Sequence, residues 1–190
     1  MAKKKDSSEA LGVARRSIWF ILRAVLLISL LLGLVYACFT EGMYISNMYT
    51  IVTEGMALRA QTVLQNGPLS DLKQHFTEDF LNSDVLLNSA VYQDYTIDSY
   101  EYRYTIKGIS VMPWSKTGTV TYIERIPSII GSPKAEDISG SVPRWTSMLY
   151  KIRLQKTDGR WLISELTVVE VDPPEETLPT PDYSQLTQSP

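Results

Sequence analysis

The stretch Ser17–Phe39 reads SIWFILRAVLLISLLLGLVYACF, and the rest of the chain is organised around it. Its 23 residues contain one charged side chain, Arg23, and as a helix they would run about 34 Å, enough to cross a bilayer. Arg23 lies near the amino end, where a long side chain can reach the headgroups, and Trp19 and Tyr36 lie near the two expected interfaces. A buried core helix would need a polar stripe, which this stretch lacks. The sequence therefore predicts a transmembrane helix over residues 17–40.

The charges that flank this helix predict its orientation. Residues 1–16 carry five basic and two acidic side chains, and no basic cluster follows the helix closely. The positive-inside rule then places residues 1–16 in the cytoplasm, as a tail too short and polar to fold alone, and the body of the chain outside a single-pass cell membrane. A cleaved signal peptide and a lipidated Cys38 are alternatives, and both also leave the body extracytoplasmic.

The composition of residues 41–172 narrows the functional classes. They hold 12 basic and 16 acidic side chains, so nucleic acid is not an expected partner. Cys38 is the only cysteine and His75 the only histidine, which argues against disulfides and against a zinc site in this region. The patterns typical of nucleotide binding or of a serine nucleophile are missing from the sequence. We therefore expect no cofactor, no metal and no catalysis.

Helical periodicity continues beyond the transmembrane stretch. Apolar residues recur at steps of three and four from Ile45 to Leu64, which predicts an amphipathic helix that continues from the membrane and stops at residues 66–68. Its expected polar face is Ser46, Asn47, Thr50, Glu54, Arg59 and Gln61. A second helix is predicted from Leu69 or Ser70 to Phe80, with Phe76 and Phe80 as its core anchors.

From Tyr95 the apolar period changes to two, which predicts strands. The first ends at Pro113, and the parity of its apolar residues flips at residues 107–108, as a β-bulge would cause. It is expected to pair with a second strand over Thr117–Ile126. Residues 127–143 are rich in Pro, Gly and Ser, which favours an irregular loop.

Two more strands complete the predicted domain. The third is expected over Trp145–Gln155, and Thr157-Asp158-Gly159 should turn it tightly into the fourth, Arg160–Val171. Residues 41–172 thus form one predicted extracytoplasmic domain. The remaining residues, 173–190, form an acidic, Pro-rich tail that we expect to be disordered.

Tyrosines give the clearest candidate for a binding surface, because several of the eleven fall on one sheet region. The candidate pocket or interface consists of Tyr95, Tyr100, Tyr102, Tyr104, Tyr122, Ile129 and Ile130. Tyrosine is also a favourable strand residue whose hydroxyl reaches water, so the same pattern fits an ordinary sheet. A catalytic pocket would in addition need a desolvated carboxylate, for which Asp94, Asp98 and Glu101 are the candidates.

The order of helices and strands, with the hairpin KTDGRWLIS at residues 156–164, resembles the NTF2-like domains. The resemblance covers residues 43–172 and implies an α+β fold in which helices pack on a curved antiparallel sheet. A basic tail, one span and such a domain are also similar to the inner-membrane scaffold components of conjugation and type IV secretion machines and to sporulation ring proteins. This similarity implies an assembly module in a bacterial envelope complex, with other envelope proteins or a second copy as partners. The same fold hosts isomerases, so a small-molecule-binding or isomerase-like domain with a Tyr-lined pocket is the alternative.

Overall fold

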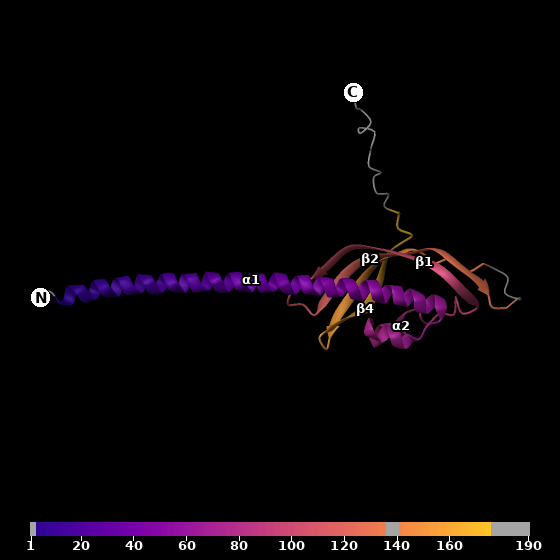
Figure 1. Cartoon of the computed structure of the whole chain (residues 1–190), viewed down its shortest axis with the longest axis horizontal. Coiled ribbons are helices and arrows are strands. Elements are labelled where there is room, and N and C mark those ends of the chain that lie inside the picture. Colours follow the sequence, from indigo (N-terminus) through magenta and orange to yellow (C-terminus); the bar gives the residue numbers. More distant parts are fainter. Residues whose placement is uncertain (1–2, 136–140, 176–190) are drawn as a thin grey trace, which may run out of the picture.

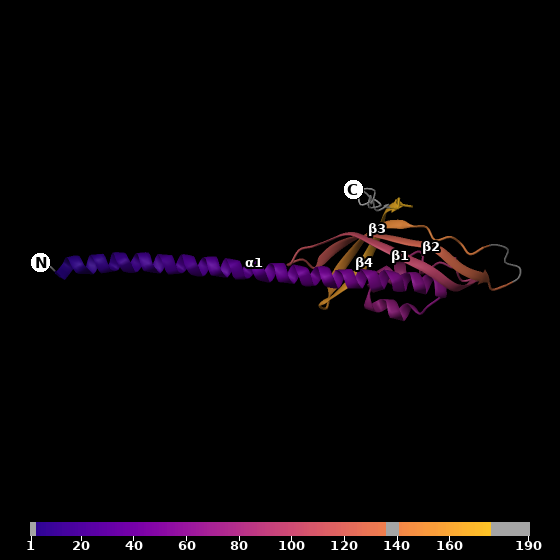
Figure 2. The same ribbon diagram turned by 45° about the horizontal axis from the view of Figure 1, so that its top comes forward.

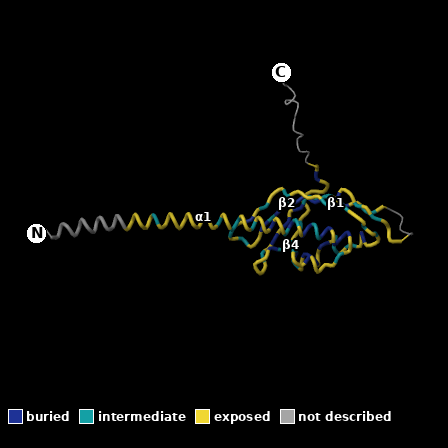
Figure 3. Tube along the Cα trace, in the orientation of Figure 1, coloured by how far each residue is buried: buried dark blue, intermediate teal, exposed yellow. Residues whose placement is uncertain are grey.

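The computed structural model describes residues 3–135 and 141–175, with side chains from Ile18 onward, and its fold is α+β. Helix α1 (Lys3–Gln65) is unbroken over 63 residues, and its first half projects from the domain as a rod (Figure 1). The part from Ile18 onward is long and apolar enough to cross a membrane, and its most apolar window is not buried at all (Figure 3). The predicted continuation of the apolar stretch into the amphipathic helix is therefore confirmed. Because a helix propagates more easily than it nucleates, α1 also extends back through most of the predicted tail, to Lys3.

The second predicted helix is wrong, because the chain divides there into two short elements. A 3-10 helix, η1 (Leu69–Gln74), is followed by α2 (Glu78–Ser83). Between them the backbone pairs with Ile163: the Ile163 N–H donates to the His75 carbonyl at 2.7 Å, and the Thr77 N–H donates to the Ile163 carbonyl at 2.9 Å. The Thr77 hydroxyl then caps α2 by accepting from the Phe80 N–H at 3.3 Å. Backbone hydrogen bonds to Ile163 and the Thr77 cap thus replace the hydrogen bonds of one continuous helix.

Four antiparallel strands follow, and each pairs with its neighbours in sequence. They are β1 (Tyr95–Val111), β2 (Thr117–Pro133), β3 (Met148–Thr157) and β4 (Arg160–Val171), and their order in the sheet is β1-β2-β3-β4. The second half of α1 lies along one face of this curved sheet, and α2 lies on the same side (Figures 1 and 2). The sheet and the carboxyl-terminal half of α1 therefore enclose the core.

The register of the strands confirms several local predictions. The pairing of β1 with β2 shifts between Ile106 and Gly108, where the parity of apolar residues predicts a bulge. Asp158 and Gly159 form the tight turn between β3 and β4, with φ values of 50° and 82°, and glycine adopts such an angle without steric cost. β4 has the predicted bounds, Arg160–Val171. The third predicted strand starts three residues later than expected, at Met148.

The predicted loop over residues 127–143 is wrong at its beginning, because β2 continues to Pro133. The ladder resumes where Glu101 pairs with Ser128, after a register shift between Glu101 and Arg103. Pro127 falls at this irregularity, where a residue that cannot donate a hydrogen bond is tolerated within a strand. Residues 136–140 of the predicted loop and residues 176–190 of the predicted tail lie outside the described part of the chain.

Buried side chains form two clusters between α1 and the sheet. The larger includes Met48, Val52, Met56, Leu72, Phe76, Phe80, Tyr122, Tyr150, Ile152, Leu154, Trp161 and Ile163. The smaller, near the end of α1, includes Ala60, Val63, Leu64, Tyr92, Ile126 and Trp145. In Figure 3 the buried positions of α1 fall in its second half, opposite the strands. β2 and β3 contribute Val120, Tyr122, Tyr150 and Ile152 to the larger cluster, and all four are buried.

Candidate functional site

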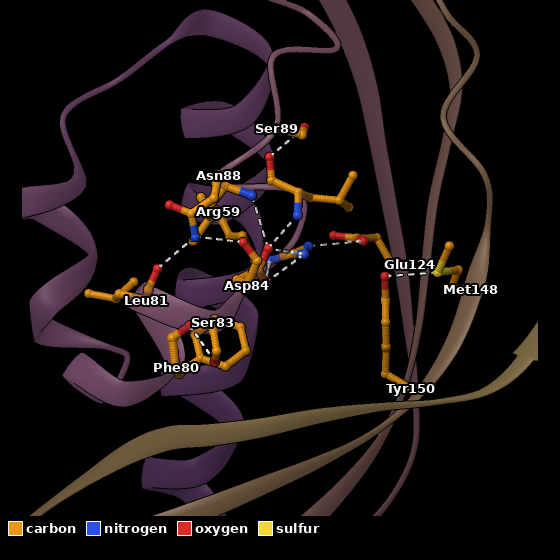
Figure 4. Close-up of polar contacts among 12 residues, drawn as sticks. Arg59, Phe80, Leu81, Ser83, Asp84, Asn88, Ser89, Glu124, Met148 and Tyr150 are labelled. Atoms are coloured by element: carbon orange, nitrogen blue, oxygen red, sulfur yellow. Dashed lines mark hydrogen bonds and ion pairs between the residues drawn. The ribbon is translucent and has the colours of Figure 1, made fainter.

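A buried ion pair joins α1 to the segment after α2. Arg59 of α1 donates from Nε to Asp84 Oδ2 at 2.9 Å and from Nη2 to Asp84 Oδ1 at 3.1 Å (Figure 4). The two side chains are 4% and 5% exposed, so this pair is largely removed from water. Arg59 was assigned to the polar face of its helix, and this assignment is wrong. It lies three residues after Met56 and four before Val63, both of which are buried.

Asp84 is held in place by its own backbone surroundings as well as by arginine. Its Oδ1 accepts from the N–H groups of Leu86 and Leu87, each at 2.9 Å. Its carbonyl accepts from the Asn88 side-chain amide at 2.8 Å (Figure 4). An aspartate that bonds backbone groups two and three residues ahead stabilises a turn. Asp84 therefore orders the segment after α2 and presents its carboxylate to Arg59.

Glu124 of β2 is the third charged member of this cluster and is completely buried. Its Oε2 lies 3.9 Å from Arg59 Nη1, which is an ion pair beyond hydrogen-bond distance. Among the described residues, neither of these two atoms has a hydrogen-bond partner. Oε1 accepts from the Tyr102 hydroxyl at 3.3 Å. Desolvation raises the pKa of Glu124 to about 7, although the Arg59 charge and the hydrogen bond from Tyr102 act in the opposite direction.

Tyrosines from three strands surround Glu124. The hydroxyls of Tyr102 and Tyr122 lie 2.9 Å apart, and the Tyr104 ring stacks on Tyr122 with centroids 5.6 Å apart. Burial raises the pKa of Tyr102 and Tyr122 above the ordinary value, and it raises the pKa of Tyr150 to about 12. The Tyr150 hydroxyl donates to Met148 Sδ at 3.1 Å (Figure 4). These phenols therefore stay protonated at neutral pH and act as hydrogen-bond donors in the core.

The seven residues predicted as one pocket or interface lie in several places. Tyr102, Tyr104 and Tyr122 are brought together beside Glu124. Tyr100 and Ile129 instead pack against the smaller buried cluster. Tyr95 pairs with Pro133 at the start of the sheet, and Ile130 is 60% exposed. Tyr102 and Tyr104 also line a groove of about 610 Å³ on the sheet, together with Arg103, Thr105, Lys107, Ile123, Arg125, Pro174 and Glu175.

The carboxylates considered as catalytic bases do not have the environment that this role needs. Asp94, Asp98 and Glu101 are all exposed, so none of them is desolvated. The desolvated carboxylate is Glu124, which the sequence analysis missed. The alternation of the strand could have predicted its burial, because Glu124 lies on the same side of β2 as Tyr122 and Ile126, both of which are buried. With no exposed surface of its own, Glu124 ties the sheet to α1 and offers no path to a substrate.

Comparison with known proteins identifies no relative of this chain: no family model, no curated protein and no solved structure matches it. Within residues 3–135 and 141–175, no group of three or more His, Cys, Asp or Glu side chains is placed to hold a metal ion. The membership of residues 43–172 in the NTF2-like domains stays a prediction.

Proposed function

We propose that the protein is a membrane-anchored assembly module of a bacterial envelope complex. In this proposal α1 crosses the cell membrane once, and the domain on the extracytoplasmic side binds other envelope proteins or a second copy of the chain. The continuity of α1 supports the proposal, because the same helix supplies the apolar stretch and the buried residues Met48, Val52 and Met56. A domain built on the end of its own anchor is held at a fixed height above the bilayer.

The observation that carries the proposal is the open edge of β4. β4 is the last strand of the sheet, and among the described residues its outer edge pairs only at Ile163, with the segment around Phe76. Beyond that point Val168, Val169 and Val171 are 47%, 58% and 58% exposed. An open edge with exposed β-branched residues is a template for a strand from another chain.

Residues 172–175, the part of the chain after β4 that the structure describes, leave this edge free. Arg125 donates from Nη2 to the carbonyls of Pro173 and Pro174 at 2.8 Å and 2.9 Å. These bonds direct residues 173–174 over β2 and away from the outer edge of β4. Within residues 3–135 and 141–175, the outer edge of β4 beyond Ile163 is therefore open to a partner strand, while the buried Glu124 has no comparable access.

Photocrosslinking in intact cells tests the proposal. A benzophenone amino acid replaces Val169 on the open edge, and a matched control replaces Val85, which is 81% exposed and lies after α2. We expect Val169 to give discrete crosslinked products, either with envelope proteins or with a second copy, and Val85 to give few. Val171→Lys should strongly reduce the products from Val169, because a lysine on an edge strand opposes strand addition. Equal yields from Val169 and Val85, or products that persist with Val171→Lys, argue against the proposal.

A further inference from the structure

Two hairpin tips lie side by side at the end of the domain nearest the projecting half of α1. One is the β1–β2 tip, residues 112–116, and the other is the β3–β4 tip, residues 156–160. The Lys156 N–H donates to the Lys116 carbonyl at 2.8 Å and so joins the two tips. Both views show these tips directed toward the amino-terminal part of α1 (Figures 1 and 2).

The β1–β2 tip exposes large apolar side chains from an ordered turn. Trp114 is 79% exposed and Met112 is 57% exposed. The Ser115 N–H donates to the Met112 carbonyl at 2.9 Å, and the Ser115 hydroxyl donates to the Thr117 carbonyl at 2.6 Å. The turn is thus held by its own hydrogen bonds, while its tryptophan stays outside the core. An exposed Trp on an ordered turn suits a surface that meets a partner or a membrane interface.

The position of α1 sets the height of these tips above the apolar stretch. Ile18–Phe39 contains 22 residues and rises about 33 Å as a helix, close to the roughly 30 Å of a hydrocarbon core. Tyr44 follows five residues later, about 7.5 Å further along the axis, near the outer limit of a headgroup layer. The tips meet α1 at this level: Lys156 Nζ donates to the Tyr44 hydroxyl at 3.0 Å, and the rings of Tyr44 and Trp161 lie 5.4 Å apart.

We propose that the two tips dock on the bilayer that holds α1, with Trp114 and Met112 placed in its headgroup interface. This inference rests on the membrane anchoring proposed above. Trp prefers this interface because its ring is apolar and its N–H can bond water or headgroups. Lys116, Lys156 and Arg160 on the tips outnumber the acids at this level, Glu41 and Asp158. That small positive excess favours anionic headgroups.

Docking gives the domain a second attachment beside α1. One helix through a bilayer leaves the domain free to rotate about the helix axis and to tilt with the helix. A Trp-bearing tip to one side of α1 opposes tilting, because tilting would extract the tip from the headgroup interface, whereas rotation about the helix axis would not. β4 begins at the docked tips with Arg160 and runs away from them to Val171. The exposed valines at the end of its open edge therefore lie on the side of the domain away from the bilayer. The membrane contact therefore orients the surface that the proposed function uses.

Fluorescent labels on the full chain test the docking. In a Cys38→Ser background, single cysteines at Met112, Val85 and Leu31 are labelled with the fluorophore NBD, and the chain is reconstituted in phosphatidylcholine–phosphatidylglycerol vesicles. Cys38 is the only native cysteine, so each label is unique. We expect a nitroxide attached near the lipid headgroup to quench the Met112 label strongly and the Val85 label weakly, and we expect Trp114→Ser to reduce the Met112 quenching. A nitroxide deep in the acyl chains should quench the Leu31 label.

The three labels separate the two proposals. If the Leu31 label is quenched but the Met112 label behaves like the Val85 label, the docking is overturned while the anchoring stands. If the Leu31 label also escapes quenching, both are overturned. If Trp114→Ser leaves the Met112 quenching unchanged, the tryptophan does not hold the tip at the interface, which overturns the assignment to Trp114.

Discussion

Arg59→Met is expected to lower the free energy of unfolding by about 3–5 kcal/mol. The substitution removes the partner of Asp84, which bonds Arg59 at 2.9 Å and 3.1 Å, and the counter-charge of Glu124. Both carboxylates are buried, so water cannot replace the lost guanidinium. The methionine keeps much of the side-chain volume, which separates the loss of charge from the opening of a cavity.

Urea denaturation of the full chain in detergent, followed by the fluorescence of buried Trp145 and Trp161, measures this effect. Arg103→Met is the matched control, because Arg103 pairs with Glu101 at 2.7 Å but both side chains are half-exposed. Its expected cost is below about 1 kcal/mol. If Arg59→Met and Arg103→Met shift the midpoint equally, the buried cluster does not hold α1 to the sheet.

Glu124→Gln is expected to remove a pH dependence of stability that the native chain shows between about pH 4.5 and 7. Burial raises the pKa of Glu124 from 4.5 to about 7, so between these values the folded chain holds a proton that the unfolded chain has released. Stability from this group is fully present below the lower pKa and is lost as pH rises through the upper one. A shift of this size corresponds to about 3 kcal/mol. Glutamine resembles the neutral carboxyl and does not titrate.

Unfolding midpoints measured at several pH values test this prediction. The native chain should become less stable from pH 5 to pH 8, and Glu124→Gln should flatten that part of the curve. Glu165→Gln serves as control, because Glu165 lies 3.9 Å from Arg153 on the exposed side of β4. Parallel curves for the native chain and Glu124→Gln would show that Glu124 does not titrate in this range.

Local patterns in the sequence were enough to predict the elements whose signal lies within a few residues. The Asp158–Gly159 turn and the limits of β4 follow from turn chemistry and from alternation. The bulge near Gly108 follows from a change of parity. The apolar stretch predicts the projecting, amino-terminal half of α1, because length and hydropathy are enough to identify such a helix.

The errors arose where distant contacts decide the structure. Pro127 looked like the start of a loop, but pairing of Ser128 with Glu101 continues β2 through it. The helix predicted through Phe76 is interrupted because Ile163, almost ninety residues away, takes its backbone hydrogen bonds. Propensity and composition cannot anticipate such pairing.

The buried cluster was missed for a related reason. Arg59 and Glu124 are charged residues at apolar positions of their elements, and a charge normally indicates a solvated face. Their burial depends on each other and on Asp84, which comes from a third segment. The tyrosine pattern identified the region around Tyr102 and Tyr122, but it did not predict that the Glu124 carboxylate would be buried beside these two hydroxyls.

Extraction of membranes from cells that produce the full chain is the most direct test of anchoring by α1. We expect the protein to remain with the membranes after washes with high salt and with alkaline carbonate. The double variant Leu27→Lys, Leu31→Lys should be released, because each lysine at the centre of a span costs about 3 kcal/mol of insertion free energy. Release of the native chain by salt alone would show that α1 does not cross the bilayer, and the proposed function would fail with it.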